Sequence, residues 1–157
     1  QQPTPFIDFS VIGLVHFLVL FVLVQTLAVV SGAHFNPAVT AGVAVAGRFP
    51  ARDVIPYWIA QLVGGFGAVL VMAIVYSGDV MDALHTQPGS GIDSWAALVL
   101  EIVATALFVM VILTVATDER AAWNGVMAPF LIGLYIFTGA IIRGRSVTWK
   151  GRTYISR

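Results

Sequence analysis

Four long apolar runs, separated by shorter polar segments, dominate the pattern of the chain. They cover residues 9–30, 54–76, 95–117 and 125–142. Glu101, in the third run, is the only Asp, Glu, Lys or Arg residue that falls inside any of them. An α-helix needs about 20 predominantly apolar residues to cross the hydrocarbon core of a bilayer, which is about 30 Å thick. The pattern therefore predicts four membrane-spanning helices.

A fifth apolar segment, residues 37–46, is too short to span a membrane. It reads PAVTAGVAVA, and at 1.5 Å per residue it would form a helix about 15 Å long. Asn36 stands at the N-cap position, Pro37 suits the first helical position and Gly47 suits the end. Irregular backbone at membrane depth is tolerated only where it lines a cavity or packs against protein. The segment therefore predicts a re-entrant half-helix between the first two spans.

Composition agrees with a membrane protein and narrows the function classes. Of the 157 residues, 59% are hydrophobic and 10% charged, whereas a soluble domain carries about 25% charged residues. The net charge is zero, so no nucleic-acid partner is expected, and without cysteine neither a disulfide nor a thiolate metal site is expected. Because Gln1 is not methionine and no basic residue precedes the first run, we expect no cleavable signal peptide. We expect instead that the chain was processed or that its true beginning is missing.

The charges outside the apolar runs predict how the chain crosses the membrane. Arg48 and Arg52 lie beside the half-helix, whereas the loop 77–94 contains acidic residues but no lysine or arginine. The positive-inside rule therefore places the first loop in the cytoplasm and the second outside. We expect an integral, multi-pass protein of a plasma or inner membrane. Residues 143–157 are basic yet fall on the outer side, so they form an atypical tail beyond the membrane domain, 1–142.

The segment from Ser31 to Thr40, SGAHFNPAVT, is the candidate functional site. The N-terminus of a half-helix carries unpaired N–H groups and about half a positive charge near the bilayer midplane. The Asn36 amide adds a side-chain donor there, and residues 32–35, if extended, would present a ladder of carbonyl acceptors. Such a site can bind a neutral hydroxyl oxygen while it repels cations.

These ten residues closely resemble the first Asn-Pro-Ala signature of the aquaporin and glycerol-facilitator (major intrinsic protein) family. The resemblance covers roughly residues 9–137 and corresponds to the family's second through fifth helices. It implies six spanning helices and two half-helices in inverted repeats, assembled as homotetramers with one pore per subunit. The fold class we expect is thus an all-α membrane protein, an incomplete aquaporin-like bundle of four spanning helices and one half-helix.

The resemblance also implies roles for single residues. The pore or substrate candidates are Gly32, Ala33, His34, Asn36, Pro37, Ala38 and His16. His16 lies where the family places one wall of its outer constriction, although a hydrogen bond inside the bundle is an equal alternative. Gln61 would brace the loop, and Glu101 stands where a family carboxylate supports the second half-helix. We expect His34 to tie the loop to neighbouring helices rather than to bind a metal.

The expected function is a channel that passes water or small uncharged solutes such as glycerol through a lipid bilayer. The family's second Asn-Pro-Ala cannot occur, because Asn124 is the only asparagine besides Asn36. A truncated copy is therefore expected, and the alternative is a non-conducting structural or regulatory fragment. A proton-coupled transporter or intramembrane enzyme is a third hypothesis, but the sequence has no nucleophile motif, paired catalytic carboxylates or metal-ligand spacing. We expect no enzyme and no cofactor, and water against glycerol stays open.

Overall fold

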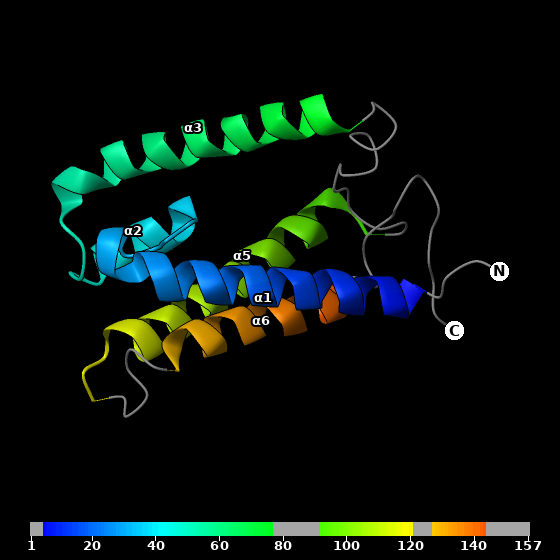
Figure 1. Cartoon of the computed structure of the whole chain (residues 1–157). Helices are drawn as coiled ribbons and strands as arrows, with labels where there is room; N and C mark the ends of the chain where they lie inside the picture. The colour runs from blue at the N-terminus through cyan, green and yellow to red at the C-terminus, as the bar shows by residue number, and fades with distance from the viewer. Residues whose placement is uncertain (1–4, 77–91, 121–126, 144–157) are drawn as a thin grey trace.

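The computed structural model describes residues 5–76, 92–120 and 127–143, and these residues form helices joined by short loops (Figure 1). In chain order the elements are α1 (Pro5–Ser31), α2 (Pro37–Val45), α3 (Ala51–Val75), α5 (Ser94–Ile112), the π-helix η1 (Leu113–Thr117) and α6 (Ala128–Arg143). The described ranges contain no β-strand. The predicted all-α fold is therefore confirmed. The tail 144–157 lies outside the described residues.

Three helices are long and apolar enough to cross a membrane. They are Phe9–Ser31, Ala51–Val75 and Ser94–Thr117, which correspond to the first three predicted spans. The fourth predicted span, 125–142, is a shorter helix: α6 has 16 residues, about 24 Å at 1.5 Å per residue. Pro129 stands in its first turn, where a missing backbone N–H is tolerated. The described residues thus give three span-length helices and one shorter apolar helix, where the sequence pattern predicts four full spans.

Helices α1 and α6 lie side by side along most of their length (Figure 1). Two glycines allow this close approach. A Cβ added at Gly133 would lie 2.8 Å from the Phe17 ring, and one added at Gly13 would lie 3.1 Å from the Cβ of Ala140. Small residues of this kind permit two helix backbones to pack closely.

Helix α5 joins α6 through an aromatic contact. The rings of Phe108 and Tyr135 stack with 5.2 Å between their centroids, and the Tyr135 hydroxyl donates to the carbonyl of Ala104 at 2.7 Å. The buried apolar core lies where α1, α2, α5, η1 and α6 meet. Its members are Val24, Ala33, Val39, Val43, Phe108, Ile112, Val115, Ala128 and Ile132.

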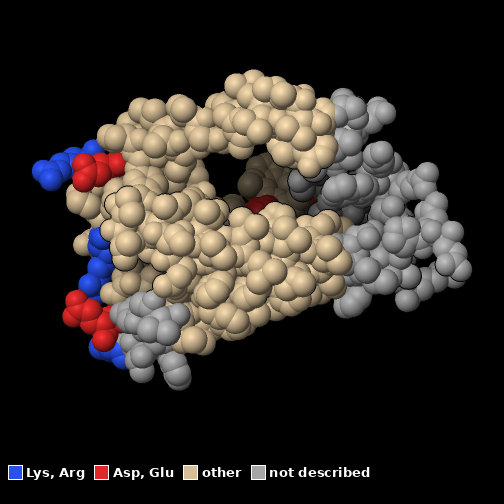
Figure 2. Space-filling model, viewed as in Figure 1, with Lys and Arg blue, Asp and Glu red and all other residues tan. Residues whose placement is uncertain are grey.

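Helix α3 stands apart from this core. It packs chiefly on α2, and none of its residues is buried (Figure 1). Figure 2 shows a deep opening between the layer that contains α3 and the layer below it. On the face drawn in Figure 2, most of the coloured charged side chains gather at one end of the molecule, where α2 leads into α3 and where η1 ends, and an acidic patch lies inside the opening. The first predicted loop and residues 118–120 of the third therefore share one end, as alternate loops of a membrane protein require.

Candidate functional site

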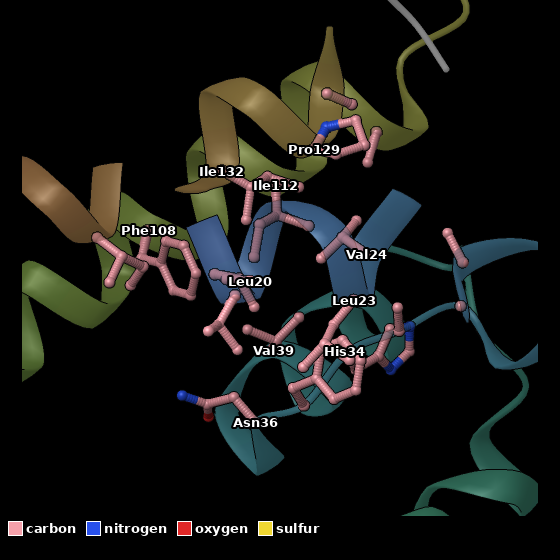
Figure 3. A pocket seen from close by; sticks show the side chains of 18 of the residues that line it. Leu20, Leu23, Val24, His34, Asn36, Val39, Phe108, Ile112, Pro129 and Ile132 are labelled. Atoms are coloured by element: carbon pink, nitrogen blue, oxygen red, sulfur yellow. The ribbon is translucent and has the colours of Figure 1, made fainter. Parts of the chain in front are cut away.

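Asn36 closes the N-terminal end of α2. Its backbone is extended, with φ −148° and ψ 127°, and its side-chain Oδ1 accepts from the Ala38 N–H at 2.8 Å. Pro37 follows as the first helical residue, as the sequence pattern predicts. No described residue accepts a hydrogen bond from the Asn36 Nδ2 group, and in Figure 3 the amide projects away from the α2 ribbon. The side chain therefore caps the helix with one atom and leaves two N–H donors for another acceptor.

The loop that leads into α2 is not extended. Gly32, Ala33 and Phe35 have φ values of +83°, +48° and +50°, all in the left-handed region. The expectation that residues 32–35 are extended is therefore wrong, and the ladder of carbonyl acceptors stays a prediction. The chain must turn back between the end of α1 and the start of α2, and left-handed residues produce that turn. Left-handed φ in a residue other than glycine costs of order 1–3 kcal/mol, and such strain gathers at functional sites.

A cluster of polar side chains holds the loop before α2 in place. The Thr40 side chain is fully buried, and its hydroxyl donates to the Asn36 carbonyl at 3.2 Å. The same Oγ1 accepts from Gln61 Nε2 at 3.1 Å and lies 3.2 Å from His34 Nδ1. The Oε1 atom of Gln61 is buried without a hydrogen-bond partner among the described residues. Gln61 thus contacts the half-helix through Thr40. Gln61 is the residue for which the resemblance implies a bracing role.

Aromatic side chains hold His34 in place. Its ring centroid lies 5.0 Å from that of Phe49 and 4.8 Å from that of Tyr57. Its backbone N–H donates to the Tyr57 hydroxyl at 3.2 Å, and the neighbouring Trp58 donates its indole N–H to the Pro37 carbonyl at 3.0 Å. His34 therefore ties the loop to α3. No group of three potential metal ligands occurs within the described part of the chain.

A cavity of about 550 Å³ brings five of the seven pore candidates together. It is lined at one side by Gly32, Ala33, His34 and Asn36 and further along by His16. Most of the remaining lining is apolar, and Figure 3 shows that α1, α5 and α6 contribute to it through side chains such as Leu20, Phe108 and Ile132. Few polar groups in an apolar wall are typical of a site for a small molecule.

His16 lines the cavity and bonds within its own helix, and its place in an outer constriction stays a prediction. Its Nδ1 lies 2.8 Å from the Ile12 carbonyl one turn earlier in α1, so this nitrogen bonds within its own helix. The side chain is exposed and lines the cavity at the same time. A ring that holds its proton on Nδ1 for the Ile12 carbonyl presents Nε2 as an acceptor to the cavity.

The remaining candidates lie outside this cavity. Ala38 lines a second cavity of about 740 Å³ at the charged end, together with Arg48, Asp118 and Arg120. Pro37, Gln61 and Glu101 line neither cavity. Tyr57 and Trp58 also contact the half-helix and are not among the residues expected from the sequence. Their spacing from Gln61 gives a usable signal, because residues three or four positions apart in a helix share a face.

At the charged end of the molecule, Asp118 and Arg120 form an ion pair in the short loop after η1. Asp118 accepts from Arg120 Nε at 2.9 Å and from its terminal nitrogen at 2.7 Å, and also from its backbone N–H at 3.0 Å. These bonds lower the pKa of Asp118 from 3.8 to about 2 and raise that of Arg120. Arg48 adds a smaller attraction to the Asp118 carboxylate. The pair follows η1 directly and closes the end of the third span.

Comparison with known proteins agrees with these features. The family described as Major intrinsic protein matches residues 2–148. "Probable aquaporin TIP1-2" of Oryza sativa subsp. japonica is 38% identical over 139 residues, which cover 86% of this chain and 54% of that protein. "Aquaporin Z" of Photorhabdus laumondii is 40% identical over 139 residues, covering 82% and 58%. "Aquaporin AqpM" of Methanothermobacter marburgensis is 35% identical over 152 residues, covering 94% and 61%.

The match extends over most of this chain but over little more than half of each relative. The chain spans from 54% to 61% of the length of these three proteins. The span-length helices and the family match over residues 2–148 together assign the chain to a protein family. The chain belongs to the major intrinsic protein family and is a multi-pass integral membrane protein.

Proposed function

We propose that this chain forms part of a passive pathway for water and small uncharged solutes such as glycerol. One observation carries the proposal: the cavity at the N-terminal end of α2, which His16 and the loop before Asn36 line together with Asn36 itself. The helix end contributes about half a positive charge, and the Asn36 amide contributes two donors. A neutral oxygen is attracted by this arrangement, whereas a cation is repelled.

The cavity has a few polar groups in an otherwise apolar wall, and this lining suits passive diffusion of a solute rather than catalysis of a reaction. The Asn36 amide can donate to a passing oxygen, and the His16 ring offers an acceptor further along α1. Between them the wall consists of side chains such as Leu20 and Val39, which make few hydrogen bonds and hold a small solute weakly. Weak binding at successive points permits entry and exit. The proposal assigns no catalytic residue and no cofactor.

The relatives are longer, so the complete pathway is a proposal about a longer assembly. We propose that a second half-helix completes the pore where such a segment is present and that the complete protein forms tetramers. The proposed support of that second half-helix by Glu101 rests on the resemblance alone, because Glu101 lies on an exposed part of α5 outside both cavities.

A non-conducting membrane fragment is the second candidate function. The observation that favours it is the exposure of α3, no residue of which is buried, together with the opening in Figure 2. A pathway with an incomplete wall lets lipid enter, and lipid would block the passage of water. The two candidates therefore differ in conduction and not in fold.

Osmotic shrinkage of proteoliposomes separates the two candidates. The purified chain is reconstituted at a known protein-to-lipid ratio, and shrinkage after a sucrose step is followed by stopped-flow light scattering. The pathway predicts shrinkage faster than in empty vesicles and entry of glycerol down its own gradient. Rates equal to those of empty vesicles, with the chain shown to be folded and inserted, would leave the non-conducting fragment as the function.

A further inference from the structure

Three side chains from adjacent turns of α3 reach across to the half-helix. The Tyr57 hydroxyl accepts from the His34 N–H at 3.2 Å, the Trp58 indole N–H donates to the Pro37 carbonyl at 3.0 Å, and Gln61 Nε2 donates to Thr40 Oγ1 at 3.1 Å. Their three partners, His34, Pro37 and Thr40, flank Asn36 on both sides in the chain. We call these three bonds the α3 clamp.

The Trp58 bond is the one closest to Asn36. Pro37 follows Asn36 directly, and its carbonyl belongs to the first turn of α2. A helical carbonyl has two lone pairs, one of which serves the intrahelical hydrogen bond. The indole N–H of Trp58 uses the other and so fixes the tilt of the peptide unit between Pro37 and Ala38, whose N–H donates to Asn36 Oδ1.

This contact differs from the ordinary role of a tryptophan near the end of a span. An interfacial tryptophan keeps its N–H toward the lipid headgroups or water. Trp58 is only partly exposed and turns its N–H inward to a backbone carbonyl of another element. Trp95, at the start of α5, is 74% exposed and provides the contrast.

We propose that Trp58 is a positioning residue for permeation, which sets the orientation of the Asn36 amide at the edge of the cavity through its bond to the Pro37 carbonyl. The inference rests on the proposed function, because it concerns the same site. Trp58 itself lines neither cavity, so it acts through Asn36 and not on the solute. Its loss therefore changes how the site selects solutes and not only how stable the protein is.

The test compares Trp58→Phe with Trp95→Phe as a matched control. Both changes remove an indole N–H and keep an aromatic ring, but only the first removes a bond to α2. The chain has only two asparagines, Asn36 and Asn124, so labelling with ¹⁵N-asparagine gives two side-chain amide pairs in an NMR spectrum. We expect Trp58→Phe to shift the Asn36 pair and leave the Asn124 pair in place, while Trp95→Phe shifts neither.

Two further readouts complete the test. In Trp58→Phe we expect hydrogen exchange of the α2 amides to accelerate roughly 2- to 10-fold, the effect of one net hydrogen bond. We also expect the ratio of water to glycerol permeability to change by a similar factor at equal amounts of folded protein. An unshifted Asn36 pair, or the same permeability ratio in both variants, would overturn the proposal.

The readouts distinguish failure of this inference from failure of the proposed function. If the unmodified chain conducts no better than empty vesicles, the proposed function fails, whatever the NMR spectrum shows. If the unmodified chain conducts and Trp58→Phe behaves as Trp95→Phe does, the proposed function stands and the positioning role of Trp58 is refuted.

Discussion

Asn36 divides two tasks between the atoms of its amide group. Its Oδ1 caps α2 through the Ala38 N–H, and its Nδ2 group stays available beside the cavity. The sequence predicts the cap, because asparagine before proline at the start of a short apolar run has a known local geometry. It does not predict the left-handed φ of Ala33 and Phe35, because these residue types rarely adopt that conformation. The turn is imposed by the positions of α1 and α2.

Substitutions at Asn36 should separate stability from conduction. Asparagine and aspartate cap helices about equally well, so Asn36→Asp should keep most of the stability, whereas Asn36→Ala should lose about 1 kcal/mol. Both remove the amide donors, and we expect both to lower water permeability roughly 2- to 10-fold. Thermal unfolding and stopped-flow shrinkage of the same preparations measure the two effects. Full permeability in Asn36→Asp would show that the amide is not part of the pathway.

The buried pair of Thr40 and Gln61 should show coupled energetics. Thr40→Val leaves Gln61 Nε2 without its acceptor in a side chain whose Oε1 already has no partner among the described residues, and this should cost about 1–3 kcal/mol. Replacing both partners removes that penalty, so the double variant with Gln61→Leu should lose less than the sum of the single variants. Unfolding free energies in one detergent give the comparison. Strict additivity would mean that the contact carries no energy.

Among the elements, α2 is the one that the sequence predicts most completely. A run too short to span, with a cap, a proline and a following glycine, leaves few alternatives. The shorter α6 and the π-helix η1 are less predictable, because the apolar run 125–142 starts before α6 does and no residue type specifies a π-turn. Within η1 and the end of α5, the Thr114 and Thr117 hydroxyls donate to Met110 and Leu113 carbonyls at 3.0 Å and 2.7 Å. Such bonds help to satisfy carbonyls where the helix widens.

The contact between α1 and α6 should depend on Gly133. A Cβ at this position would lie 2.8 Å from the Phe17 ring and 3.0 Å from the Phe17 carbonyl oxygen, so the backbone would have to move. We expect Gly133→Ala to destabilise the protein by about 1–3 kcal/mol. Gly64→Ala in α3 is the control, because nothing lies within 4 Å of the added Cβ, and there better helix propensity should stabilise by up to about 1 kcal/mol. Equal effects in a thermal unfolding series would refute the close α1–α6 packing.

The loop after η1 should respond to acid only at low pH. Hydrogen bonds from Arg120 hold the pKa of Asp118 at about 2, below its ordinary 3.8, so the folded state favours the carboxylate. The stabilisation from this pair is therefore complete above about pH 4 and is lost as the pH falls through about 2. Arg120→Gln should return the Asp118 pKa toward its ordinary value, as followed by ¹³C NMR of the carboxyl carbon. An unchanged pKa in that variant would show that the two side chains do not pair in solution.

The molecule as a unit consists of a packed part, formed by α1, α2, α5, η1 and α6, and a helix α3 that is attached chiefly through α2. The sequence predicts the family and the number of apolar segments, because both follow from local patterns. It does not predict how far α3 stands from α1 and α5, since that separation depends on which helices fill the space between them. Because α3 stands apart from the packed part, the same fold is compatible with a conducting pathway and with a non-conducting fragment.

We propose that solute passes through the cavity beside Asn36, and chemical modification of single cysteines gives a direct test of this route. The chain has no cysteine, so a single one can be placed at Ala28, which lines the cavity, or at Ala60 on α3, which lines neither cavity. Each variant is reconstituted and treated with a water-soluble thiol reagent, and osmotic shrinkage is measured before treatment, after it and after reduction. We predict that the reagent blocks Ala28→Cys, that reduction restores it, and that Ala60→Cys and the unmodified chain do not respond. A fast flux through Ala28→Cys that a demonstrated modification leaves unchanged would show that solute does not pass through this cavity.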